Sequence, residues 1–303
     1  AADPLYRVQK LLINNVSLAM PHGMVGPFNA EVAVGKRGEF EQLLVTADGM
    51  PATFTVEPYE DKYRFGLEAQ GWSLPHAEGL RFSSLTINGV GNSEAVDIND
   101  IRGVLYGGTM TGTGRLFFDG QWRLLAKARF SNLQSEALTA ALSPATNVAG
   151  SLSADAALVA SGRSLDELPQ KPQLQARVNV HDGSANNFDL ITAIRYNNPG
   201  GNGLRGGKTR FDDLTLAVDA REGRYRFSSI GLRSGLLNAS GDLGVGKDGK
   251  WSGNLQVHMK SAVNPLSAPL YVSGPLDSPL LSLRALNVPP AGGDESAQPA
   301  VAD

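Results

Sequence analysis

The stretch that decides the fold is WSGNLQVHMK, residues 251–260. From Trp251 to Met259, every second residue is apolar or glycine, and the residues between them are polar. Because successive side chains of a β-strand point to opposite sides of its sheet, this alternation predicts a strand with one apolar and one polar face. Leu255 and Val257 fall in the middle of the predicted apolar face.

The same alternation recurs along most of the chain. In residues 122–130 the apolar positions are Trp122, Leu124, Ala126, Ala128 and Phe130, and further alternating segments span residues 63–69, 174–180, 214–218 and 225–227. Asp-Gly or Glu-Gly steps occur at residues 48–49, 119–120, 222–223 and 248–249. Such steps between alternating segments predict antiparallel hairpins, and their spacing predicts roughly 14 strands.

Three segments interrupt the strand pattern and are predicted to be helical. Residues 131–142 open with a capping box of Ser131 and Gln134, residues 164–167 carry a second capping box before a proline, and residues 184–194 have apolar residues at helical spacing. From residue 287 the sequence has no periodicity, so residues 287–303 are predicted to be a disordered tail after a β-rich domain of residues 1–286. The fold class is mainly β, with a long antiparallel sheet and a few short helices.

Composition narrows the possible functions. The 303 residues are 42% hydrophobic and 19% charged, and a net charge of −3 gives no electrostatic case for nucleic-acid binding. The absence of cysteine excludes disulfides and cysteine-based metal sites. No run approaches the roughly 18 apolar residues of a membrane-spanning helix, and the first residues do not resemble a signal peptide. We therefore expect a soluble chain, or one from which a targeting segment or anchor has been removed.

Short motifs give no case for catalysis. GGNGLRGGKT, residues 200–209, resembles a phosphate-binding loop, but its first glycine is displaced, and it follows a predicted helix and precedes a predicted strand, the reverse of the required order. GGTMTGTG, residues 107–114, is interpreted as twisted strand because no predicted helix follows it. None of the four histidines has a partner at metal-ligand spacing. We therefore expect no enzymatic activity, no cofactor, no metal site and no nucleotide binding.

Seven segments in order resemble the AsmA-like family of bacterial envelope proteins. They are LYGGTMTGTGRL (105–116), LQSEALTAAL (133–142), NVAGSLSADAALVASGRSLDEL (147–168), VNVHDGSANNFDLITAI (178–194), KTRFDDLTLAV (208–218), IGLRSGLLNASGDLGV (230–245) and PLYVSGPLDSPLLSL (269–283). The resemblance is strongest over residues 80–283. It implies a relative of bridge-like lipid-transfer proteins, with a long curved sheet that forms an elongated, taco-like apolar groove. It also implies a periplasmic location, with an inner-membrane anchor in the full-length protein.

The implied partners are phospholipid acyl chains and the bacterial inner or outer membrane, and the implied role is phospholipid transfer and outer-membrane homeostasis. Strand alternation is the same in a closed, dry core and in an open groove, and the residues alone favour the dry core. The resemblance favours the groove instead. The predicted lining residues are Trp122, Leu124, Phe130, Leu214, Leu216, Val218, Trp251, Leu255, Val257 and Met259. The alternative function is a non-enzymatic scaffold with a dry core that assists outer-membrane or secretion-system assembly through its strand edges.

Overall fold

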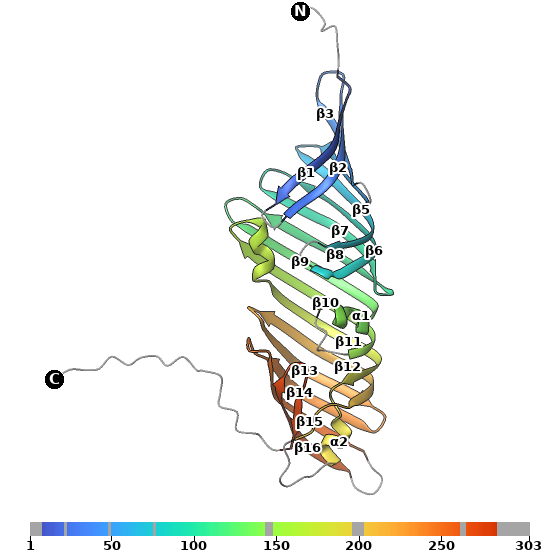
Figure 1. Ribbon diagram of the computed structural model, residues 1–303, viewed down its shortest axis with the longest axis vertical. Helices are drawn as coiled ribbons and strands as arrows, with labels where there is room; N and C mark the ends of the chain where they lie inside the picture. Colours follow the sequence, from blue (N-terminus) through green and yellow to red (C-terminus); the bar gives the residue numbers. More distant parts are fainter. Residues whose placement is uncertain are drawn as a thin grey trace, which may run out of the picture.

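In the computed structural model, the described part of the chain forms 17 strands in one sheet, stacked along the long axis of the molecule (Figure 1). Each strand pairs with the strand that follows it in sequence, always antiparallel, so the sheet is a continuous meander. The structure describes residues 8–20, 23–47, 50–74, 77–142, 148–195, 203–260 and 265–283. The tail predicted from residue 287 and the domain boundary at 286 lie outside these residues.

The mainly β fold class is confirmed. The first nine strands are β1 (Lys10–Met20), β2 (Gly23–Val34), β3 (Phe40–Ala47), β4 (Met50–Tyr59), β5 (Lys62–Leu74), β6 (Ala77–Gly91), β7 (Ala95–Leu105), β8 (Gly108–Phe117) and β9 (Trp122–Gln134). The others are β10 (Val148–Gly162), β11 (Gln173–Asn186), β12 (Lys208–Arg221), β13 (Arg224–Ser234), β14 (Leu237–Val245), β15 (Lys250–Met259), β16 (Leu266–Pro275) and β17 (Leu280–Ser282). These 17 strands exceed the roughly 14 expected from turn spacing. One of them, β17, has only three residues and is too short to show an alternation pattern.

The strand registers give the sheet one apolar and one polar face. A single row of directly paired positions crosses sixteen strands, from β1 to β16, and contains only apolar residues and glycine. Its members, the central row, are Ile13, Ala30, Val45, Phe54, Leu67, Ile87, Ile101, Gly112, Ala128, Ala156, Ala176, Val218, Phe227, Leu243, Gly253 and Val272. The residues that precede and follow these positions belong to the opposite, polar face.

β-Bulges distort three alternate strands. In β9, β11 and β13, two residues oppose one residue of a neighbouring strand. One residue of each pair has a left-handed backbone, namely Asn132 (φ 56°), Asp182 (φ 50°) and Ser229 (φ 52°). Because a bulge bends its strand and increases the local twist, these positions curve the sheet along one side.

The two α-helices are shorter than predicted and begin later. The first, α1 (Ser135–Leu142), starts four residues after the predicted start because residues 131–134 complete β9. The second, α2 (Leu190–Arg195), starts six residues late because residues 184–186 belong to β11. The helical segment predicted at residues 164–167 is the 3-10 helix η1 (Leu165–Gln170), which contains Pro169 instead of ending before it.

A buried row follows the side of the sheet on which the helices pack. It takes one residue from each of seven strands, β9 to β15: Leu133, Leu152, Val180, Leu214, Leu232, Ala239 and Val257. Leu138 of α1 packs against the same core, and α2 buries Leu190, Ala193 and Ile194. The principal core therefore lies at one side of the apolar face, with the central row beside it.

Candidate functional site

The candidate site is the apolar face of the sheet, because continuous rows of apolar residues and glycine cross almost every strand there. A second row beside the central row also crosses β1 to β16 without a charged residue. Its members are Leu11, Val32, Leu43, Val56, Phe65, Gly89, Ile98, Gly114, Ala126, Leu158, Leu174, Ala220, Tyr225, Val245, Trp251 and Gly274. With neighbouring strands about 4.8 Å apart, fifteen strand-to-strand steps give a path about 70 Å long.

The apolar face divides into an open section and a closed end. In the open section, β1 to β13, central-row residues are half-buried or more exposed, and Leu11 and Ile13 of β1 are 49% and 39% exposed. In the closed end, β14 to β17, the apolar side chains are almost all buried; Val257 and Leu270 are 0% exposed. The same alternation therefore serves two different environments.

Segments from elsewhere in the chain cover the closed end. The Phe188 ring meets the Trp251 ring edge-on at 5.5 Å between centroids, and Trp251 Nε1 donates a hydrogen bond to the carbonyl oxygen of Leu276 at 3.1 Å. The backbones of Leu204 and Leu281 exchange hydrogen bonds of 2.8 and 2.9 Å. These contacts and α2 make the cover a part of the core.

Small residues form the middle of the open section. The central row consists of Gly112, Ala128, Ala156 and Ala176 where it crosses β8 to β11, and these positions are half-buried. With no side chain longer than a methyl group, they fill less space above the sheet than Ile101 and Val218, their neighbours in the central row. Ala128 and Ala176 lie in alternating segments identified from the sequence, but none of the four residues was predicted to line the groove, because glycine and alanine give a weaker apolar signal than large residues.

All ten predicted lining residues project from the apolar face. Trp122, Leu124, Phe130, Leu216 and Val218 are half-buried in the open section, and Leu214 lies in the buried row of the helix side. The four from β15 are Trp251, Leu255, Val257 and Met259, and all lie buried in the closed end. These four are core residues there, because the segments that cover them come from other parts of the sequence. Contact of any of the ten residues with lipid stays a prediction.

The glycine-rich stretch before β12 does not have the strand–loop–helix order of a phosphate-binding loop. Lys208 and Thr209 open a strand, and the Thr209 hydroxyl donates to the carbonyl oxygen of Phe188 at 2.6 Å and accepts from the amide of Leu190 at 3.0 Å. Thr209 is 1% exposed, and its two hydrogen bonds fix the segment that leads into α2. Residues 108–117 likewise form strand β8, as interpreted from the sequence.

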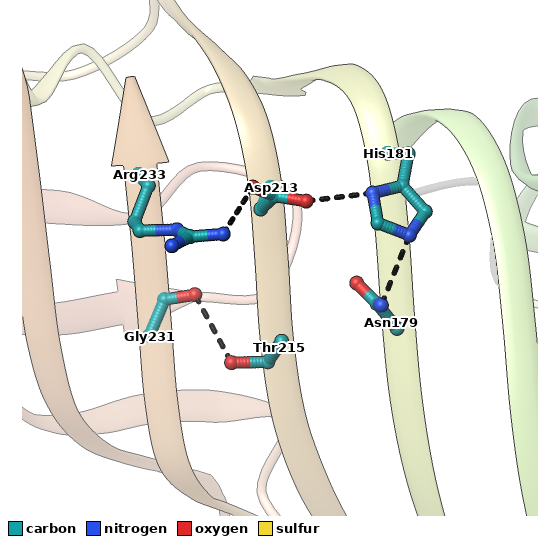
Figure 2. Close-up of polar contacts among 6 residues, drawn as sticks. All are labelled: Asn179, His181, Asp213, Thr215, Gly231 and Arg233. Atoms are coloured by element: carbon teal, nitrogen blue, oxygen red, sulfur yellow. Dashed lines mark hydrogen bonds and ion pairs between the residues drawn. The ribbon is translucent and has the colours of Figure 1, made fainter. Parts of the chain in front are cut away.

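The polar face carries a charged cluster that sequence analysis missed (Figure 2). Asp213 of β12 lies between His181 of β11, whose Nδ1 is 2.6 Å from Oδ1, and Arg233 of β13, whose guanidinium is 2.5 Å from Oδ2. Asn179 Nδ2 lies 3.1 Å from His181 Nε2. A neutral His181 with its proton on Nδ1 donates to Asp213 and accepts from Asn179. The cluster thus joins three strands on the face opposite the apolar rows.

The ionised form of Asp213 is favoured in this cluster. The hydrogen bond from Arg233 is the largest cause that holds the pKa of the Asp213 carboxyl below its ordinary value, and His181 adds to the lowering, while desolvation opposes both. His181 and Asp213 are separated by 32 positions in sequence and meet only because β11 and β12 pair in this register. Within the described residues, no three His, Asp or Glu side chains come together to hold a metal ion.

The AsmA family model matches residues 24–230, from β2 into β13. The chain belongs to the AsmA family. Its match begins well before residue 80, where the resemblance of the individual segments becomes strong, and includes most of the open section but none of β14 to β17. No curated protein and no solved structure matches the chain significantly. Membership fits a protein of the bacterial envelope. No helix in the described part of the chain has the length and apolarity needed to cross a membrane.

Proposed function

We propose that this AsmA-family chain holds or transfers phospholipid between the inner and outer membranes and thereby supports outer-membrane homeostasis. The open section of the apolar face is the path for the acyl chains, and the protein acts without catalysis. In the full-length protein the β-rich part is periplasmic and held at the inner membrane by an anchor. The observation that carries this proposal is the central row, which crosses β1 to β13 without a polar residue and without full burial.

The length of the path favours acyl chains that move along it. Each leaflet of a bilayer has a hydrocarbon thickness of about 15 Å, half of the roughly 30 Å core. The open section crosses twelve strand-to-strand steps, about 60 Å at the usual spacing. A site for one bound lipid would need only a fraction of that length, so the path suits several lipids or one that changes position.

The polar face explains how a sheet with such an apolar face stays in water. Ion pairs such as Arg129–Asp155, at 2.7 Å, and Arg115–Asp97, at 3.1 Å, lie on that face with exposed side chains. Exposed pairs of this kind contribute little to folding free energy, but they keep the face hydrated. The apolar face is then the surface that we propose for lipid.

A pair of variants in β12 tests the proposal. Val218 projects into the central row, between Ala176 and Phe227, and Ala217 projects from the opposite face beside Arg177. A carboxylate in the acyl path has to be desolvated when an acyl chain passes, at a cost of several kcal/mol. We therefore expect Val218→Asp to reduce the transfer of a fluorescent phospholipid between vesicles by about tenfold or more, and Ala217→Asp to leave it unchanged.

Both variants should remain folded, because a side chain in the open section can keep its carboxylate in contact with water. Circular dichroism melting checks this. Equal transfer by the two variants and by the unmodified protein would contradict an acyl path on this face. Absence of transfer by the unmodified protein would instead favour the scaffold function.

A further inference from the structure

The boundary between the open section and the closed end is marked by three aromatic rings. Phe227 of β13 and Phe188, which precedes α2, both contact Trp251 of β15, with ring centroids 5.6 and 5.5 Å apart. Phe227 is half-buried and belongs to the central row, and Trp251 is 6% exposed and belongs to the second row. The cluster therefore stands across both apolar rows at the point where they cease to be open.

Beyond this cluster, Gly253 of the central row is exposed but has no side chain, and the row offers no exposed apolar side chain on which an acyl chain could lie. Its next large members, Leu243 and Val272, are 9% and 2% exposed. In the two neighbouring rows, Leu270 and Val245 are 0% and 5% exposed. Each is already covered by other side chains of the same protein.

The cover is held by specific polar contacts in addition to its apolar packing. Asp189 accepts hydrogen bonds from the backbone amide and hydroxyl of Thr192 at 2.9 and 2.8 Å, which fixes the first turn of α2. The Arg205 guanidinium donates to the Ser278 hydroxyl at 3.1 Å, and Asn187 Nδ2 donates to the carbonyl oxygen of Asp277 at 3.3 Å. Hydrogen bonds thus join each of the two covering segments, residues 187–195 and 203–206, to residues 276–282.

We propose that the aromatic cluster Phe188–Phe227–Trp251 is an end-stop for the acyl path, so that lipid enters and leaves from the open section and does not pass over β14 to β17. This inference rests on the proposed lipid-binding function and specifies which part of the apolar face the lipid occupies. The residue that blocks the path is Phe227. Its ring lies in the central row, and an acyl chain would meet it first when it moves from β12 toward β14.

The test uses the unmodified protein and vesicles of phosphatidylethanolamine that carry a diazirine at the end of one acyl chain. After illumination, the labelled residues are located by peptide mass spectrometry. We expect labels in the open section, β1 to β13, and none in residues 237–282. Labels within residues 237–282 would overturn the end-stop. Absence of label from the whole chain would contradict the proposed function itself, so the two failures are distinguishable.

A second measurement examines Phe227 directly. We expect Phe227→Ala to move the farthest labelled position into β14, toward Leu243, its partner in the register. Arg226→Ala is the matched control, because Arg226 is exposed on the polar face of the same strand. An unchanged label pattern in folded Phe227→Ala would show that Phe227 does not stop the chain.

Discussion

The open section and the closed end share one sequence pattern but differ in what covers them. Val218 in β12 and Val257 in β15 both occupy apolar positions of an alternating strand, yet Val218 is half-buried and Val257 is completely buried. The difference comes from α2, which contacts β15, β16 and β17, and from Phe188, Leu204 and Leu276, which pack against the same core. An alternating strand therefore specifies which side chains share a face, while distant segments decide whether that face becomes core or surface.

The largest expected difference between the two regions is their response to a buried charge. Val257→Asp places a carboxylate where the side chain has no contact with water, which costs several kcal/mol or forces protonation. We expect this variant to lose cooperative thermal unfolding or to melt far below the unmodified protein, as measured by circular dichroism. The control is Gln256→Asp on the polar face of the same strand, which should melt normally. A normal melting temperature for Val257→Asp would show that the closed end is not closed.

Truncation of leucines gives a smaller and graded form of the same comparison. Leu270 in β16 is 0% exposed, and Leu124 in β9 is half-buried in the open section. Leu270→Ala should lower the free energy of unfolding by about 2–5 kcal/mol, because it leaves a cavity. Leu124→Ala should cost about 1 kcal/mol, because its site is already partly hydrated. Urea titration measures both, and equal losses would argue against a division of the apolar face.

The smallest expected effect lies on the polar face, where Asp213 joins β11, β12 and β13. Since the folded protein holds the Asp213 pKa below its ordinary value, the stabilisation is present above the ordinary pKa of about 3.9 and is lost as the pH falls through the lowered value. Asp213→Asn should therefore lower the melting temperature slightly at pH 7, and this difference should shrink below about pH 4.

Asp212→Asn is the matched control for this comparison, because Asp212 is the exposed neighbour in the same strand. It should change the melting temperature less than Asp213→Asn at pH 7. A difference between Asp213→Asn and the unmodified protein that is constant down to pH 2 would contradict the electrostatic account of the cluster.

Much of the sheet could be predicted from the sequence because its signal is local. The alternation over residues 251–259 reproduces β15 almost to the residue, and the Asp-Gly step at 119–120 falls between β8 and β9. Helix starts were less predictable. The capping-box spacing of Ser131 and Gln134 competes with strand pairing to β10, where Leu133 lies opposite Leu152, and pairing prevails.

The covered and open parts of the site could not be separated in the same way. Trp251 is buried because Phe188 and Leu276 contact it, and both lie at least 25 positions away in sequence. The His181–Asp213 pair depends on a register that no short motif encodes. The continuous central row likewise emerges only when fifteen registers are combined.

The most direct test of an acyl path on the open section is to identify what the protein carries. The protein is purified from bacterial envelopes in a detergent-free buffer, and its bound molecules are extracted and identified by mass spectrometry. We predict bound phospholipid, retained by Ala217→Asp and strongly reduced in Val218→Asp. A folded, unmodified protein that carries no phospholipid, and takes up none from vesicles, would contradict the account.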